Sequence, residues 1–139
     1  MPTRRALLAL LPAAGLAGTA RAAESWRIVT EYPANAMPGE GIAHFAVGAT
    51  RLSGGALSVT PGFDAPDGLR SAAMIRAAAD GRVQAADAFT GALAGEAPIF
   101  QLSALPFLTA SAEDTARLLR AARPAYAAAL EARGVTLLY

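Results

Sequence analysis

The sequence predicts an α/β fold, a parallel-rich sheet flanked by helices, and three observations support that prediction. Short segments rich in β-branched and aromatic residues alternate with longer segments of helical apolar spacing. Clusters of glycine and proline separate these segments. Hydrophobic residues make up 54% of the 139 residues, which is enough for the packed core of one domain or one lobe.

The first 23 residues have the pattern of an export signal. An Arg-Arg pair at residues 4–5 precedes an apolar stretch over 6–17, which is too short to span a membrane stably. Residues 20–22 fit the A-x-A pattern, which predicts cleavage after Ala22 or Ala23. The arginine pair also resembles a twin-arginine signal, so the general secretory and twin-arginine routes both stay open. We therefore expect the rest of the chain to be exported.

The charge of the chain comes largely from this signal. Its removal takes away three arginines and leaves nine basic groups against eleven acidic ones, a net charge of −2. Such a balance gives no electrostatic footprint for nucleic acid, and we expect no insertion of the mature chain into a membrane. The absence of cysteine excludes disulfides and thiolate metal sites, and neither a metal nor a cofactor is expected.

The first half of the mature chain predicts two strands around one helix. The segment 26–30 reads as a strand that ends before Pro33. Residues 39–52 have helical spacing, and Ser-Gly-Gly ends that helix. Residues 56–60 alternate as a second strand. The apolar face of the helix is expected to contain Ile42, Phe45, Ala46, Ala49 and Leu52.

The second half predicts further alternation of helices and strands. An alanine-rich helix over 69–80 is followed by a short strand within 83–91. Ser111 and Asp114 form a capping-box-like pair, and the helix they begin is expected to break or restart at Pro124. Residues 135–139 predict a last strand.

In a parallel sheet, ligands bind beyond the carboxyl ends of the strands. Here that edge would consist of residues 31–35, 61–67 and 89–95.

The ordered set of segments resembles the start of a solute-binding protein of the tripartite ATP-independent periplasmic (TRAP) transporters, in the dicarboxylate-receptor family. The resemblance covers essentially all of residues 1–139 and lies in the order of the motifs, since none is diagnostic alone. The motifs are a Ser-Gly-Gly turn, "LSVTPG", "MIRAAADGRVQAAD", "LSALPFL" and "RGVTLLY". The resemblance implies a periplasmic-binding-protein-like lobe over 24–139, with Leu105, Phe107 and Leu108 as core packing and Pro106 fixing a turn.

The resemblance also implies a location in the periplasm, the function and the site. Family receptors capture a small organic anion, often a carboxylate, between two lobes and deliver it to TRAP permease subunits, without covalent chemistry. Glu31 would accept from a ligand donor, Asn35 and Thr90 would donate and accept, and Tyr32 and Phe89 would stack or fill space. A turn-forming role for Asn35 and a core role for Phe89 stay open.

The resemblance leaves one feature of the family unassigned. The family's carboxylate-clamping arginine lies on the second lobe, and no arginine of this sequence can be given that role. We therefore expect the sequence to be a fragment of a longer reading frame, or a truncated product that would not bind a ligand well alone.

Other functions find less support in the residues. An enzyme is not expected, because the single histidine, His44, lies on a polar helical face near Glu40 and no nucleophile motif is present. Asp64 and Asp67 lack the alternation of a calcium loop. Two alternatives stay open, namely an exported ligand-sensing module of the same fold and a non-functional receptor fragment.

Overall fold

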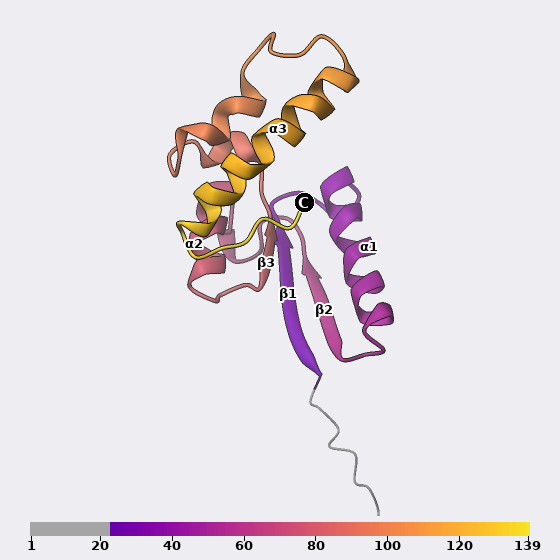
Figure 1. Cartoon of the computed structure of the whole chain (residues 1–139). Helices are drawn as coiled ribbons and strands as arrows, with labels where there is room; N and C mark the ends of the chain where they lie inside the picture. The colour runs from indigo at the N-terminus through magenta and orange to yellow at the C-terminus, as the bar shows by residue number, and fades with distance from the viewer. Residues whose placement is uncertain (1–22) are drawn as a thin grey trace, which may run out of the picture.

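The computed structural model of the protein describes residues 23–139, so the predicted export signal over residues 1–23 lies outside the described part except for its last residue. Within that part, a three-stranded sheet has helices on both faces, with further helical segments beyond it (Figure 1). The elements in chain order are β1 (Glu24–Thr30), α1 (Met37–Leu52), β2 (Leu57–Gly62), η1 (Pro66–Gly68), α2 (Ser71–Ala79), β3 (Ala85–Asp87), η2 (Thr90–Leu93), η3 (Pro98–Ala104) and α3 (Ala112–Glu131).

The sheet has the strand order β2-β1-β3, and both pairings are parallel. Glu24 lies opposite Leu57 at one end, and Thr30 lies opposite Asp87 at the other. Because all three strands run the same way, the loops that follow them leave from one edge. The α/β architecture that the sequence predicts is therefore confirmed.

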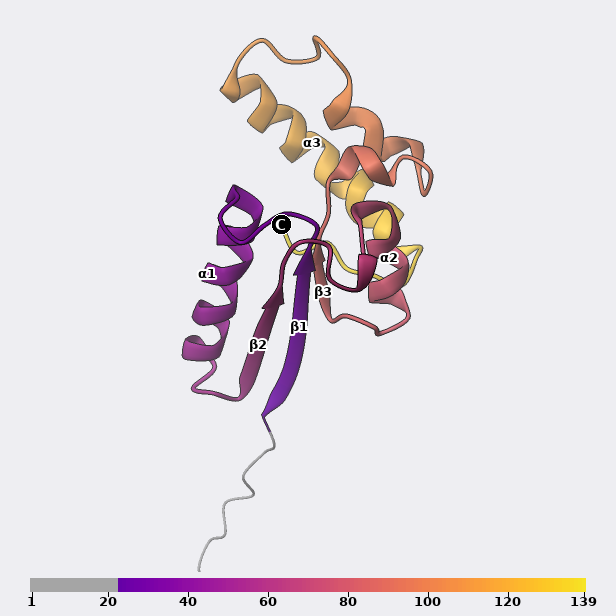
Figure 2. The same ribbon diagram turned by 180° about the vertical axis from the view of Figure 1, so that it is seen from behind.

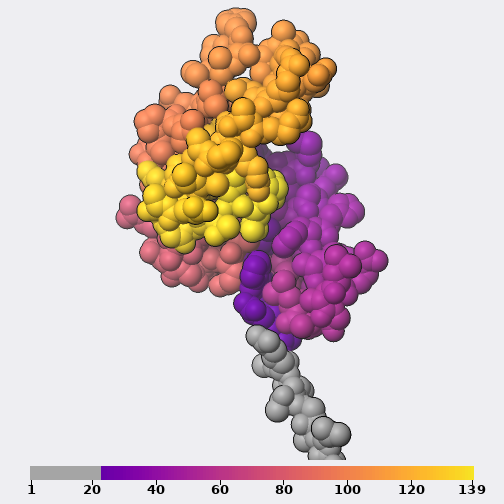
Figure 3. Space-filling view, viewed as in Figure 1, coloured from indigo at the N-terminus to yellow at the C-terminus, as the bar shows by residue number. Residues whose placement is uncertain are grey.

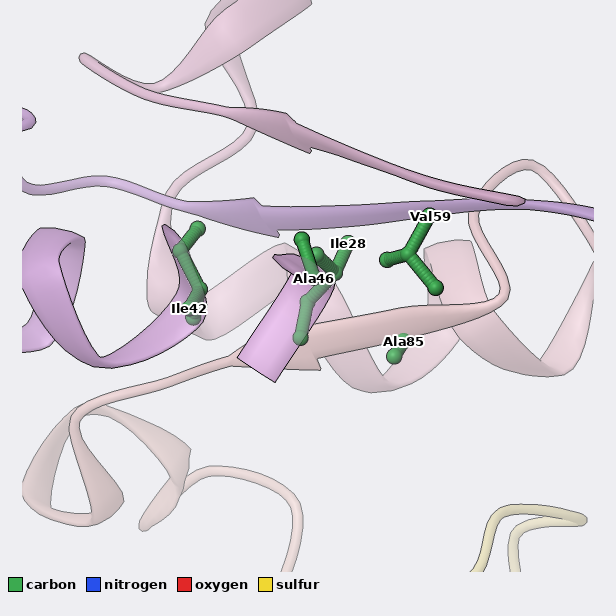
Figure 4. Packing of buried hydrophobic residues seen from close by; sticks show 5 residues of the cluster. All are labelled: Ile28, Ile42, Ala46, Val59 and Ala85. Carbon is green, nitrogen blue, oxygen red and sulfur yellow. The ribbon is translucent and has the colours of Figure 1, made fainter. Parts of the chain in front are cut away.

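The two faces of the sheet follow from the alternation of side chains along β1. Ile28 points to the α1 side, where it packs with Ile42, Ala46, Val59 and Ala85 (Figure 4). The next residue, Val29, is fully buried in a cluster on the α2 side. That second cluster contains Val29, Leu69, Met74, Ala77 and Val83.

A third cluster lies beyond the sheet, between α2, η2, η3 and α3 (Figure 2). Phe100 of η3 is 1% exposed at its centre. Its ring stacks on that of Tyr126 from α3, with ring centroids 5.8 Å apart. This cluster holds α3 against the rest of the chain.

The predicted apolar face of α1 is right at its centre and wrong at its edges. Ile42 and Ala46 are buried, but Phe45 is 41% exposed and Leu52 is 82% exposed. The helix covers only a narrow strip of a small sheet, so a narrow apolar stripe suffices. It also starts two residues before the predicted Gly39, because Pro38 fits the first turn, where its missing N–H is not needed.

The expected break at Pro124 is wrong. Helix α3 continues through this residue over 20 residues. Proline removes one backbone hydrogen bond, and this loss is tolerated because Ala122 and Tyr126 anchor the helix on both sides of it. The proline itself is exposed.

The expected last strand over 135–139 is wrong as well. These residues have no strand pairing. Val135 and Leu137 instead pack against the third cluster, and the Arg123 guanidinium donates to the Leu138 carbonyl oxygen at 3.3 Å. Side-chain contacts, rather than a β-ladder, hold this segment in place.

The expectation that the Leu-Pro-Phe-Leu stretch packs in the core is wrong too. Leu105 and Leu108 are about half exposed, and Phe107 is fully exposed. Phe100, seven residues earlier, fills the core position because η3 turns it inward. Phe107 has a φ of +63°, in the left-handed region, within the loop that lies at the far end of the molecule in both ribbon views (Figures 1 and 2).

Candidate functional site

The loops after β1, β2 and β3 meet at the carboxyl edge of the sheet. The amide of Asp64 donates to the Tyr32 carbonyl oxygen at 3.0 Å, and the amide of Ala65 donates to that of Thr30 at 3.2 Å. These two bonds join the loop after β2 to the loop after β1. The position of this edge agrees with the rule for parallel sheets, and the edge is our candidate site.

Glu31 follows β1 directly, and its carboxylate lies at the start of α2. One oxygen, Oε1, accepts from the Ser71 hydroxyl at 2.8 Å, and the other, Oε2, accepts from the Ser71 amide at 3.3 Å. A negative charge is favourable there, because the first amides of a helix lack partners within it. The Arg70 guanidinium lies 3.9 Å from Oε2 and is largely exposed.

Ser71 is a site residue that the sequence analysis missed. It is 1% exposed, and its hydroxyl both donates to Glu31 and accepts from the Phe89 amide at 2.8 Å. The loops after β1 and β3 are thereby joined through a single side chain of α2. A serine at the start of an alanine-rich helix was the available signal, but only the fold brings Glu31 and Phe89 to it.

Tyr32 and Asn35 lie in the loop between β1 and α1. Tyr32 is partly buried, whereas Asn35 is exposed. A turn closed by the Ala36 amide and the Pro33 carbonyl oxygen, at 3.0 Å, contains Asn35. This loop lies directly on the first turn of α1, since a Cβ at Gly39 would come within 2.2 Å of the Pro33 oxygen.

Phe89 and Thr90 follow β3 and point to different surroundings. Phe89 is 51% exposed, with its ring over Gly91, where a Cβ would lie 2.7 Å from the ring. The Thr90 hydroxyl lies 2.7 Å from the Ser103 hydroxyl and is thus bound to η3. Glu31 and Phe89 are therefore brought together by Ser71, while Thr90 is turned toward η3.

Asp87 is a second polar residue of the edge that the sequence analysis did not single out. One carboxylate oxygen accepts from the fully buried Thr30 hydroxyl at 3.0 Å, and the other accepts from the Tyr139 hydroxyl at 2.8 Å. Burial raises the pKa of Tyr139, and the hydrogen bond to Asp87 raises it further, so Tyr139 stays a donor. The last residue of the chain thus reaches the sheet edge.

Two hollows lie beside this edge. One, of about 500 Å³, lies between the start of α1 and the segment 138–139, and Asp87 and Tyr139 line it. The other, of about 410 Å³, lies under residues 134–139, which Figure 3 shows in yellow on the face of the molecule. Of the five predicted site residues, Thr90 lines the second hollow and the other four line neither. Of those four, Asn35 and Phe89 are exposed, whereas Glu31 and Tyr32 are partly buried.

No group of three or more histidine or acidic side chains in residues 23–139 could hold a metal ion. No helix in that part of the chain is long and apolar enough to cross a membrane.

Comparison with known proteins gave matches among solved structures only. No family model matches the chain, and no curated protein matches it. Two extracytoplasmic solute receptors of Bordetella pertussis that bind pyroglutamic acid, DctP6 and DctP7, are similar to 83% and 84% of the chain, with TM-scores of 0.78 and 0.80 and identities of 29% and 28%.

A third similar structure comes from a marine metagenome. It is a TRAP solute-binding protein specific for pyroglutamate, with a TM-score of 0.78, 28% identity and 84% of this chain covered. The chain spans 38% of the length of each of the three receptors.

Proposed function

We propose that this chain is part of a TRAP-type extracytoplasmic solute receptor and that it takes part in the capture of a small organic anion for delivery to a TRAP transporter. The single observation that carries this proposal is the similarity of sequence and fold to three pyroglutamate receptors, at 28–29% identity and TM-scores of 0.78–0.80. The ligand class we propose is a carboxylate, and no covalent chemistry is involved.

The five residues at the carboxyl edge are proposed to contact the ligand. Asn35 and Phe89 are exposed and are free to offer an amide and an aromatic face. A carboxylate has about four acceptor sites, so Glu31 can accept from a ligand N–H or O–H besides its bonds to Ser71. Tyr32 adds a phenol next to it, and Thr90 adds a hydroxyl that it shares with Ser103.

An open edge suits a receptor that closes on its ligand. Ligand sites of this kind bury most of the ligand between two walls, and here the described loops offer one wall. We propose that the second wall is a second lobe, that the protein acts in the periplasm, and that its partners are the ligand and the permease subunits of the transporter.

Calorimetric titration of the protein encoded by the complete gene tests this function, with pyroglutamate and a panel of small mono- and dicarboxylates as ligands. We expect at least one of them to bind with a Kd in the micromolar range or below. Asn35→Ala should weaken that binding tenfold or more, because it removes an exposed amide from the edge. Gln101→Ala, which removes an exposed amide from η3, is the matched control and should leave the Kd unchanged. Failure of every organic acid to bind would contradict the proposal.

A further inference from the structure

We infer that Ser71 is a positioning residue of the candidate site, which fixes the loops after β1 and β3 relative to each other and orients the Glu31 carboxylate. The effect of Ser71 on ligand binding rests on the proposed function, but its effect on the two loops does not. The inference depends on the contacts and the burial of one hydroxyl.

The hydroxyl of Ser71 has a partner on each side. It donates to Glu31 Oε1 and accepts from the Phe89 amide, each at 2.8 Å, from a side chain that is 1% exposed. Glu31 is 40 residues before Ser71 and Phe89 is 18 residues after it. One buried atom therefore links three segments that no backbone ladder joins at this point.

Helix α2 depends on the same contact. Its N-cap residue, Arg70, makes no capping hydrogen bond with its side chain. The Glu31 carboxylate supplies an acceptor to the first turn instead, through the Ser71 amide at 3.3 Å. The cap of α2 thus comes from the loop after β1. This hydrogen bond fixes the position of the loop relative to the start of the helix.

Orientation of Glu31 is the consequence for the site. Its side chain is 17% exposed and both its oxygens are held by Ser71, so a remaining acceptor position stays fixed at the edge. A preorganised acceptor binds a donor at a lower cost in conformational entropy than a free glutamate does. Ser71 contributes to binding through this residue and through Phe89, without contact to the ligand.

Loss of the hydroxyl leaves two polar groups without their partner. In Ser71→Ala, Glu31 Oε1 and the Phe89 N–H both lose a hydrogen bond in a partly buried region, which is unfavourable. Ser71→Thr keeps a hydroxyl. Ser53 is the matched control, since its Oγ also has two roles, accepting from the Leu57 amide and donating to the Thr50 carbonyl oxygen, both at 3.0 Å. It lies at the opposite end of the strands, between α1 and β2.

Amide hydrogen exchange at Phe89, followed by NMR, tests the link without any ligand. In the wild-type protein this amide should exchange at least tenfold more slowly than an unprotected amide, although Phe89 is half exposed. Ser71→Ala should remove that protection, Ser71→Thr should restore most of it, and Ser53→Ala should leave it intact. A Phe89 amide that exchanges at the unprotected rate in the wild type would overturn the inference, even if Ser71→Ala does not fold.

Binding of pyroglutamate, or of whichever carboxylate binds in the titration panel, tests the consequence for the site. Ser71→Ala should weaken it tenfold or more and Ser71→Thr much less, while Ser53→Ala should not change it. Equal affinities of wild type and Ser71→Ala would overturn the positioning role. Absence of binding by the wild type would instead contradict the proposed function, and the exchange at Phe89 would still decide whether Ser71 joins the loops.

Discussion

The first and second halves of the described chain are held together in different ways. Residues 24–87 contain all three described strands, and parallel ladders to β1 fix their relative positions. Residues 88–139 have no strand in the described structure, and one cluster centred on Phe100 and Tyr126 holds α3 to the rest. Many backbone hydrogen bonds therefore define the first half, whereas a few side chains define the second. The candidate site lies at the carboxyl ends of the strands, where the two halves meet, since Phe89 and Thr90 begin the second half.

The largest expected effect concerns that cluster. Phe100→Ala removes a side chain that is 1% exposed, and it should lower the free energy of unfolding by about 3–5 kcal/mol. Because Phe100 packs on α3 through Tyr126, the amides of α3 should lose exchange protection before those of β1 do. Urea unfolding and hydrogen exchange measure these two effects.

Phe107→Ala is the matched control, since it is the same substitution at a fully exposed position. It should change the free energy of unfolding by less than about 0.5 kcal/mol. If both variants unfold with equal loss of stability, Phe100 is not the centre of the second half. If α3 and β1 lose protection together in Phe100→Ala, the two halves form one cooperative unit.

The next effect concerns the loop between β1 and α1. Gly39→Ala places a methyl group 2.2 Å from the Pro33 carbonyl oxygen, so the backbone of that loop must move. We expect a loss of about 1–3 kcal/mol, typical of overpacking, and shifted NMR signals for residues 33–36. The substitution tests whether the loop between β1 and α1 depends on its close contact with the helix.

Gly48→Ala is the control for this substitution, in the same helix. A Cβ at Gly48 has no atom within 4 Å, so alanine should raise the free energy of unfolding by about 0.5–1 kcal/mol through its better helix propensity. Opposite signs for the two alanines are therefore expected in chemical denaturation. A gain of stability in both variants would contradict the close contact at Gly39.

The same difference between the halves explains how far the sequence predicted the fold. In residues 24–87, the first helix and the second strand have a clear period, the second helix is rich in alanine, and glycine and proline turns separate the elements. Local patterns were therefore sufficient for their order. The break at Pro124 was predicted from a local rule, but burial of Ala122 and Tyr126 outweighs one lost hydrogen bond. Residues 135–139 have the composition of a strand. A strand also needs a neighbouring strand to pair with, and the local sequence does not show whether one is present.

The candidate site was predicted only in part, for a related reason. The resemblance to the receptor family selected Glu31, Tyr32, Asn35, Phe89 and Thr90, in the segments that follow the first and third strands. The first four lie in loops of the predicted edge, and Thr90 begins η2. Their contact with a ligand remains a prediction. Ser71 and Asp87 could not be selected, because their roles depend on partners 40 and 52 residues away in the sequence.

The smallest expected effect concerns the start of α3, where a local pattern did predict the structure of the second half. The Ser111 hydroxyl accepts from the Asp114 amide at 3.1 Å and donates to its carboxylate at 2.8 Å. Ser111→Ala should therefore lower the free energy of unfolding by about 1 kcal/mol. Ser111→Asp, which keeps an acceptor, should retain most of the stability.

The pH dependence of the stability lost in Ser111→Ala distinguishes loss of the cap hydrogen bonds from a general loss of packing. The hydrogen bond from Ser111, and then the one from Arg117, hold the pKa of Asp114 below its usual value of 3.8. A carboxyl group whose pKa is lowered by folding stabilises the protein above its usual pKa, and that contribution is lost as the pH falls through the lowered pKa. The difference between wild type and Ser111→Ala should thus be largest near neutral pH and shrink below pH of about 3.8. Denaturation at pH 7 and pH 3 measures it, and a difference that is the same at both would mean that the carboxylate of Asp114 takes no part in the cap.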